Sequence, residues 1–64
     1  MDDAPTKRQR EVILCWRDAH FKITVAAKRL SISESAVNSD LFNGQRRMRL
    51  RNRYALREWA AQQN

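Results

Sequence analysis

The chain has 64 residues and a formal net charge of +6, from 13 lysines and arginines against 7 acidic residues. A chain of this length builds one small domain with a modest core. A single cysteine excludes an internal disulfide, and the chain lacks the residues for a metal site. No nucleophile–base pair, carboxylate pair or glycine-rich phosphate loop indicates an enzyme or a cofactor site. No signal peptide and no apolar run that could span a membrane are visible, so we expect a cytoplasmic protein.

The positive charge is distributed unevenly along the chain. Arginines are concentrated between residues 46 and 53, in the run RRMRLRNR. A small basic domain is attracted to polyanions, of which nucleic acid is the commonest. The alternative interpretation of such a run is a solvated charged face.

A helix is predicted to open at Thr6, because Thr6 and Gln9 have the spacing of a capping box and Pro5 suits a helix entry. Residues 1–5 before it are expected to form a short disordered arm, and residues 6–64 a single domain. The helix runs to about Asp18 and is expected to bury Val12, Ile13, Cys15 and Trp16.

Residues 23–48 read as two helices joined by a polar corner, residues 31–33. The first spans roughly Ile23 to Leu30, and Ser33 can cap the second by accepting from an early backbone N–H. Val37 and Leu41 repeat at i and i+4, so they are expected to face inward. Gly44 falls on the same buried side, which allows either close packing or an early helix end; we favour a continuous helix to about Met48. This pattern is typical of a helix-turn-helix.

A fourth helix is predicted from Arg53 to about Gln62, with Asn52 as its cap. So small a domain cannot easily bury Tyr54, Leu56 and Trp59 together. Two fourth helices packing across a two-fold axis would cover them, which predicts a homodimer. The alternative is that Trp59 packs on the first helix, near Trp16.

Three blocks of the sequence resemble the LuxR/NarL/GerE-type DNA-binding domains. TKRQREVI (residues 6–13) resembles their opening TPREREVL, AKRLSISESAV (27–37) resembles AxRLxISExTV, and RRMRLRNR (46–53) resembles KKMKLKSR. The pattern is also related to the DNA-reading segment of sigma factors. The resemblance implies an all-α, four-helix LuxR/GerE-like domain whose third helix (about 34–48) enters the DNA major groove. It also implies a fourth helix that pairs two protomers.

On this interpretation the chain is a nucleoid-associated transcriptional regulator that binds double-stranded DNA. The residues expected to face the bases are Ser35, Asn38, Ser39 and Phe42. The residues expected to hold phosphates are Lys22, Thr24, Lys28, Arg46, Arg47, Arg49 and Arg51.

A second hypothesis places the same fold in protein interaction. From Glu34 to Gln45 the third helix has two acids and no cation, and Phe42 is a residue that a protein interface would use. Such a module would bind and inhibit a LuxR-type regulator, or contact RNA polymerase. Salt-sensitive affinity for DNA discriminates between the two hypotheses.

Overall fold

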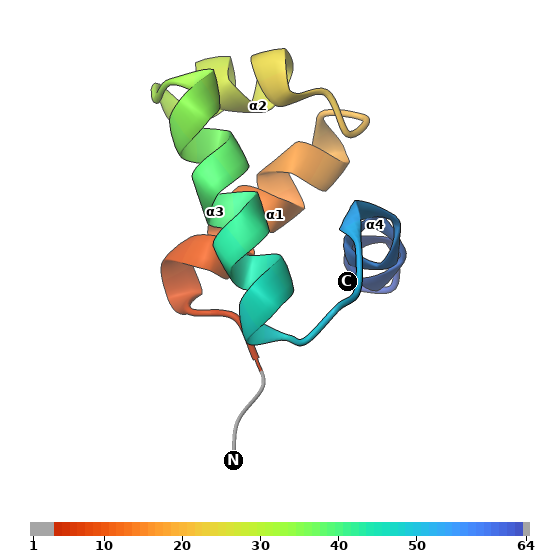
Figure 1. Ribbon diagram of the computed structural model, residues 1–64. Coiled ribbons are helices and arrows are strands. Elements are labelled where there is room, and N and C mark those ends of the chain that lie inside the picture. The colour runs from red at the N-terminus through yellow and green to blue at the C-terminus, as the bar shows by residue number, and fades with distance from the viewer. Residues whose placement is uncertain (1–3, 64) are drawn as a thin grey trace.

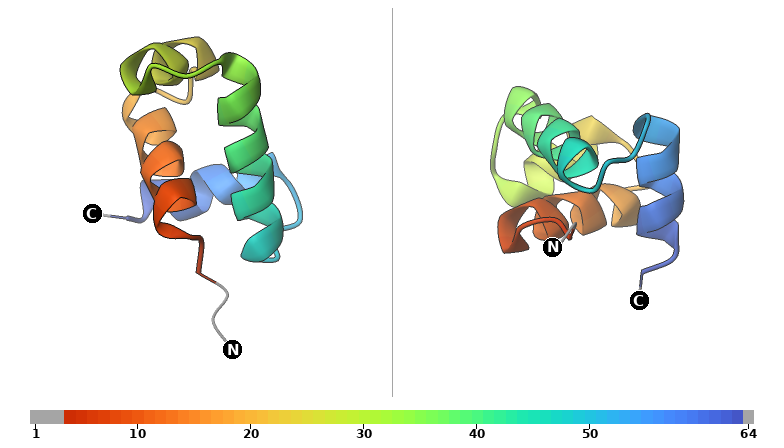
Figure 2. Two further views of the ribbon diagram at one scale, coloured as in Figure 1. Left: turned by 90° about the vertical axis from the view of Figure 1, so that its left-hand side faces the viewer. Right: turned by 60° about the horizontal axis from the view of Figure 1, so that its bottom comes forward.

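Four helices make up the computed structural model, which describes residues 4–63: α1 (Lys7–Asp18), α2 (Ile23–Leu30), α3 (Glu34–Arg47) and α4 (Arg53–Ala61). α1 and α3 lie side by side, α2 crosses one end of this pair, and α4 lies to one side of it (Figure 1, Figure 2). The described residues form no strand, so the prediction of an all-α fold is confirmed. Of the predicted arm, residues 1–3 lie outside the described part of the chain, as does Asn64.

Side chains cap three of the helices as the sequence predicted. At α1 the Thr6 hydroxyl accepts from the Gln9 backbone N–H at 3.1 Å, and the Gln9 side chain accepts from the Thr6 N–H at 3.0 Å. Ser33 accepts from the Ala36 N–H at 3.1 Å to begin α3, and Asn52 accepts from the Ala55 N–H at 2.8 Å to begin α4. Each cap satisfies a backbone donor that has no partner inside its helix.

Three helices end in the same kind of turn, although no glycine is present at any of them. In each turn a non-glycine residue takes a positive φ, and the next N–H donates to the carbonyl five residues earlier. His20, Ser31 and Arg49 have φ values of 57°, 57° and 60°. The donors that follow are Phe21, Ile32 and Leu50, which bond to Trp16, Ala27 and Gln45 at 2.8, 3.0 and 3.0 Å. The apolar residue after each turn packs against the core, which favours these strained turns.

The core lies where α1, α3, α2 and α4 meet. Its buried side chains are Val12, Ile13, Trp16, Ala19, Ala26, Ala27, Val37, Leu41, Leu56 and Ala60. The inward positions predicted for α1 and α3 are therefore confirmed, except that Cys15 is only half-buried because it lies at the edge of the apolar stripe of α1. Met48 and Leu50 pack partly against this core, which explains why they alternate with arginines.

Gly44 lies at the point where α3 approaches α1 most tightly. α3 continues through it to Arg47, so the prediction of an unbroken helix is confirmed. A Cβ at this position would lie 2.8 Å from the Cδ1 of Ile13 and 3.6 Å from the Cβ of Gln9. Because carbon atoms in contact prefer about 3.5–4.0 Å, only glycine fits between these helices without a shift of Ile13.

The end of α4 is held by an arginine of α1. Arg17 donates through Nη1 to the carbonyls of Ala60 and Gln63, at 3.1 and 2.8 Å, and forms an ion pair with Asp18 at 2.9 Å. The Ala60 carbonyl lies in the last turn of α4, where it also accepts from the Gln63 N–H at 3.1 Å, and the Gln63 carbonyl lies just beyond the helix end, where a cation is favoured. Leu56 and Ala60 complete the attachment by packing into the core.

Candidate nucleic-acid interface

The outer face of α3 carries the four residues predicted to contact bases. Ser35, Asn38, Ser39 and Phe42 are all exposed, and the side chain of Phe42 is 49% exposed. Their spacing places Ser35, Ser39 and Phe42 on the side of the helix opposite the buried stripe, with Asn38 at the edge of that side. The structure therefore brings the predicted base-contacting residues together on one accessible surface, which we call the α3 outer face.

The two acids of α3 are both engaged with neighbouring elements. Asp40 forms an ion pair with Arg8 of α1, with 3.5 Å between Oδ2 and Nε, and the Asp40 side chain is only 23% exposed. Glu34, at the start of α3, accepts from the hydroxyl of Thr24 at a long 3.4 Å. Because Asp40 turns towards α1, the α3 outer face from residue 35 to residue 43 presents polar and aromatic groups but no charge.

Predicted phosphate-binding residues lie along α2, from its N-cap to its last turn, and the start of α2 is beside the start of α3. Lys22, Thr24 and Lys28 are exposed, and Lys22 is the N-cap residue of α2 but makes no capping hydrogen bond with its side chain. The Thr24–Glu34 hydrogen bond shows that the two helix starts are adjacent. Thr24 therefore already uses its hydroxyl within the protein, and the two lysines provide the charge at this end.

A second group of cations lies at the far end of α3. Arg46, Arg47, Arg49 and Arg51 are exposed. The guanidinium carbon of Arg46 lies 5.6 Å from the centre of the Phe42 ring, a cation–π distance. Arg47 donates through Nε to the carbonyl of Ala4 at 2.8 Å. Arg46 is thereby held beside the α3 outer face, and Arg47 is tied to the segment that precedes α1.

The residues predicted to form a dimer interface do not share one face of α4. Leu56 is completely buried in the core of the monomer, so its side chain is unavailable to a second copy, and this part of the prediction is wrong. Tyr54 is 72% exposed, whereas Trp59 is half-buried and lies under Arg10 of α1 at 5.8 Å. At 100° per residue, Tyr54 and Trp59 are on different sides of the helix. The homodimer itself stays a prediction, which sedimentation tests.

Several side-chain contacts between residues far apart in the chain could not be predicted from the sequence. Arg8 and Asp40 are 32 positions apart, and Arg17 reaches carbonyls 43 and 46 positions away. Arg53 and Arg57 stack on aromatic rings of α1 and the turn after it. Helical periodicity identifies which face of a helix is buried, but it does not identify the partner of a long side chain across the fold.

A metal site and a membrane-spanning segment are two further features that residues 4–63 could contain. No group of three His, Cys, Asp or Glu side chains there lies close enough to hold a metal ion. No described helix has the length and apolar character needed to cross a membrane. Comparisons with protein families, with curated protein sequences and with solved structures found no match to this chain.

Proposed function

We propose that this protein binds double-stranded DNA and regulates transcription, with α2, the turn at residues 31–33 and α3 acting as a helix-turn-helix. The observation that supports the proposal most is the α3 outer face, which is uncharged between two groups of cations. This arrangement suits sequence-specific DNA binding, because the cations can contact phosphates that position the protein while the polar and apolar groups contact the bases. The LuxR/GerE-like interpretation of the fold belongs to the same proposal.

The dimensions of α3 suit the major groove. Its 14 residues extend for about 21 Å, and a helix with its side chains is about 10–12 Å across, close to the groove width of about 12 Å. Asn38 offers the donor and acceptor that pair with the edge of an adenine, and Ser35 and Ser39 can donate to either base type. Phe42 offers an apolar contact for a thymine methyl group.

The cations at both ends of α3 would then meet phosphates. Lys22 and Lys28 would bind the backbone at the start of α3, and Arg46, Arg47, Arg49 and Arg51 would bind it at the far end. Arg46 is already oriented by the Phe42 ring, so little side-chain freedom is lost when it binds. Neutralising phosphates releases condensed counterions, so binding should weaken steeply as salt rises.

The test is fluorescence-anisotropy binding to a random duplex across a salt series. Substituting Arg46 and Arg47 by glutamine should make the slope of log K against log salt less steep by about two units, because each phosphate contact contributes about 0.9 to its magnitude. The matched control substitutes Arg10 and Arg29 by glutamine. It removes the same charge from residues that contact Trp59 and the Asp18 carbonyl instead. Equal losses in both variants would refute the proposed placement.

Base recognition is tested separately, on the sequence that binds most tightly in a selection from random duplexes. Asn38→Ala should cost about 1–3 kcal/mol of discrimination at one base pair and leave the salt dependence unchanged. Asn43→Ala is the matched control, because it removes the same amide from an exposed position of α3 that is not among the predicted base contacts. If Asn38→Ala weakens binding equally on every sequence, Asn38 does not contact a base.

Protein interaction through the same face is the second candidate, favoured by the exposed ring of Phe42. Exposed aromatic residues are frequent anchors of protein interfaces. The partner would be a LuxR-type regulator or RNA polymerase, which this chain would bind and inhibit. Negligible DNA binding at low salt, together with capture of such a partner that Phe42→Ala abolishes, would favour this candidate over DNA binding.

A further inference from the structure

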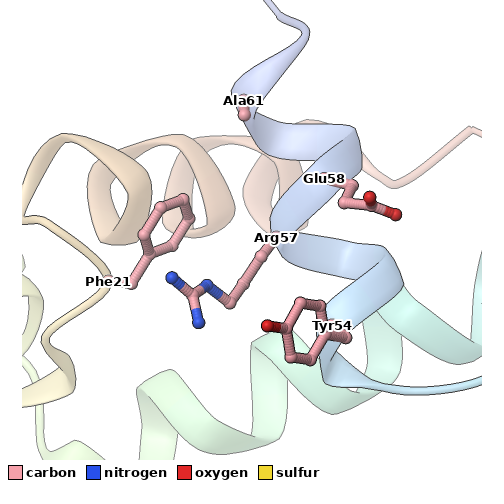
Figure 3. Close-up of a pocket in the computed structure, with 5 residues that line it drawn as sticks. All are labelled: Phe21, Tyr54, Arg57, Glu58 and Ala61. Atoms are coloured by element: carbon pink, nitrogen blue, oxygen red, sulfur yellow. The ribbon is translucent and has the colours of Figure 1, made fainter.

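The exposed side of α4 carries a second feature that the DNA-binding proposal does not use. A shallow hollow of about 190 Å³ lies there, lined by Phe21, Tyr54, Arg57, Glu58 and Ala61. Figure 3 shows the Arg57 guanidinium projecting from α4 between the rings of Phe21 and Tyr54. None of these residues belongs to α2 or α3, so this site is distinct from the α3 outer face.

The guanidinium of Arg57 is positioned by aromatic rings. Its central carbon lies 4.6 Å from the centre of the Phe21 ring and 5.7 Å from that of the Tyr54 ring. The ion pairs among residues 4–63 are Arg8–Asp40 and Arg17–Asp18, so no acidic group there pairs with Arg57. An arginine stacked in this way keeps its N–H groups available in a fixed plane, which suits a planar carboxylate.

Arg53 extends this arrangement by one helical turn. Its guanidinium carbon lies 5.8 Å from the centre of the Trp16 ring, and Trp16 contacts Phe21 edge-to-face at 4.8 Å. The Nε of Arg53 and the Nε1 of Trp16 are both buried and have no hydrogen-bond acceptor, and Trp16 as a whole is only 3% exposed. A covered donor without an acceptor is unfavourable, so an acceptor that draws Arg53 off the indole would relieve this state.

We propose that a set of four residues, Phe21, Arg53, Tyr54 and Arg57, binds an acidic segment of a partner protein. An aspartate or glutamate of the segment pairs with Arg57 and Arg53, and an adjacent apolar side chain enters the hollow against Phe21 and Ala61. Charge complementarity supports this occupant, because two arginines four positions apart on a helix repel one another until an anion binds between them. We call this set of residues the α4 acid-binding site.

The shape and charge of the hollow argue for a protein segment rather than another anion. About 190 Å³ is small for a drug-sized ligand, whose sites measure about 300–1,000 Å³, but it suits a single side chain. Glu58 lines the hollow, and its negative charge opposes a doubly charged phosphate more than a single carboxylate. The apolar lining also contributes affinity that a free phosphate could not use.

The test follows the indole N–H signals of ¹⁵N-labelled protein by NMR. The chain has two tryptophans, so Trp59→Phe assigns the Trp16 signal. The probe is the blocked tripeptide acetyl-Phe-Glu-Phe-amide, compared with its Gln analogue and with inorganic phosphate at the same ionic strength. We expect the Glu peptide to shift the Trp16 signal saturably, and the Gln peptide and phosphate to leave it unchanged.

Two variants of adjacent residues should have opposite effects. Arg57→Gln should weaken binding of the Glu peptide about fivefold, whereas Glu58→Gln should strengthen it about twofold, because the two changes remove charges of opposite sign next to the carboxylate. Arg10→Gln is the matched control, since Arg10 stacks on Trp59 instead. Circular dichroism checks that each variant folds, and the Glu58→Gln result does not depend on Arg57→Gln folding.

The proposal is overturned if the Gln peptide or phosphate shifts the Trp16 signal as strongly, or if both variants leave binding unchanged. It is also overturned if the protein is a dimer that Arg57→Gln dissociates, because a second copy would then occupy the site. The site is independent of DNA binding by α3, so Arg57→Gln should retain the wild-type salt dependence in the DNA assay.

Discussion

The contact between Gly44 and Ile13 gives a prediction in which two substitutions compensate for each other. Alanine is favoured over glycine in a helix interior by about 1 kcal/mol. At Gly44, however, the new methyl group would lie 2.8 Å from Cδ1 of a completely buried isoleucine. Overpacking a core costs about 1–3 kcal/mol. Gly44→Ala alone should therefore destabilise the protein by about 1 kcal/mol.

Shortening Ile13 removes the atom that obstructs the methyl group. Ile13→Val alone should cost about 0.5–1.5 kcal/mol, since it deletes a buried methyl. In the double variant the nearest remaining atoms are Cβ of Gln9 at 3.6 Å and the γ carbon of residue 13 at 3.8 Å, both at ordinary contact distance. The new methyl group then fills the space left by Cδ1, and the stabilisation that alanine gives to the helix relative to glycine is no longer offset by a close contact. We expect the free energy of unfolding of the double variant to lie within about 0.5 kcal/mol of the wild-type value. Because each single substitution costs about 1 kcal/mol, this result corresponds to a coupling free energy of about 2 kcal/mol between the two positions.

Urea denaturation followed by far-UV circular dichroism measures all four proteins of the cycle. The matched control is a second cycle that combines Ile13→Val with Asn43→Ala, a substitution at the exposed neighbouring position. In this cycle the changes in the free energy of unfolding should add within about 0.3–0.5 kcal/mol. Additive behaviour of Gly44→Ala and Ile13→Val would refute the argument, because it would mean that Cδ1 of Ile13 does not restrict the space beside Gly44.

Three further predictions concern the helix ends. Ser31→Gly should raise the free energy of unfolding by about 0.5–1 kcal/mol, seen as a higher urea midpoint, because glycine takes the positive φ at this position without strain; a lower midpoint would contradict this reasoning. Asn52→Ala should lower the free energy of unfolding by about 1 kcal/mol through loss of the α4 cap, while Asn52→Ser should retain most of it. Arg17→Met keeps most of the apolar stem but removes the guanidinium hydrogen bonds to the carbonyls of Ala60 and Gln63, of which Ala60 keeps only its bond from the Gln63 N–H. The thermal midpoint should therefore fall, by about 4–8 °C for each kcal/mol lost, and an unchanged midpoint would show that water replaces the guanidinium.

Local sequence signals predicted the helices well because the physics that sets them is local. The caps at Thr6, Ser33 and Asn52 and the periodic apolar residues of α3 fixed the helix limits to within a residue or two. Gly44 illustrates the limit of such reasoning. Periodicity placed it on the buried side, yet only the packing of Ile13 decided between a tight crossing and an early helix end.

The candidate sites were predictable in part. The exposure of Phe42 followed from its position away from the buried stripe of α3, and that of Asn38 from its position at the edge of the outer face. The ion pair between Asp40 and Arg8 could not be predicted in this way, because it joins two helices through side chains that are distant in the sequence. Leu56 was misassigned for a related reason. Leu56 of α4 is completely buried, whereas Trp59 packs only partly against the core, and nothing in the local pattern says which of the two is buried.

The attachment of α4 through Arg17 also bears on how the molecule opens. The completely buried side chains that join α4 to the core are Leu56 and Ala60. Its other attachments are the Arg17 guanidinium and the partly exposed side chains of Arg53, Arg57 and Trp59. Segments held by few buried groups open as units well below the free energy of global unfolding. Amide hydrogens of α4 should therefore exchange with solvent sooner than those of α1 and α3. Each such opening would briefly uncover the indole face of Trp16.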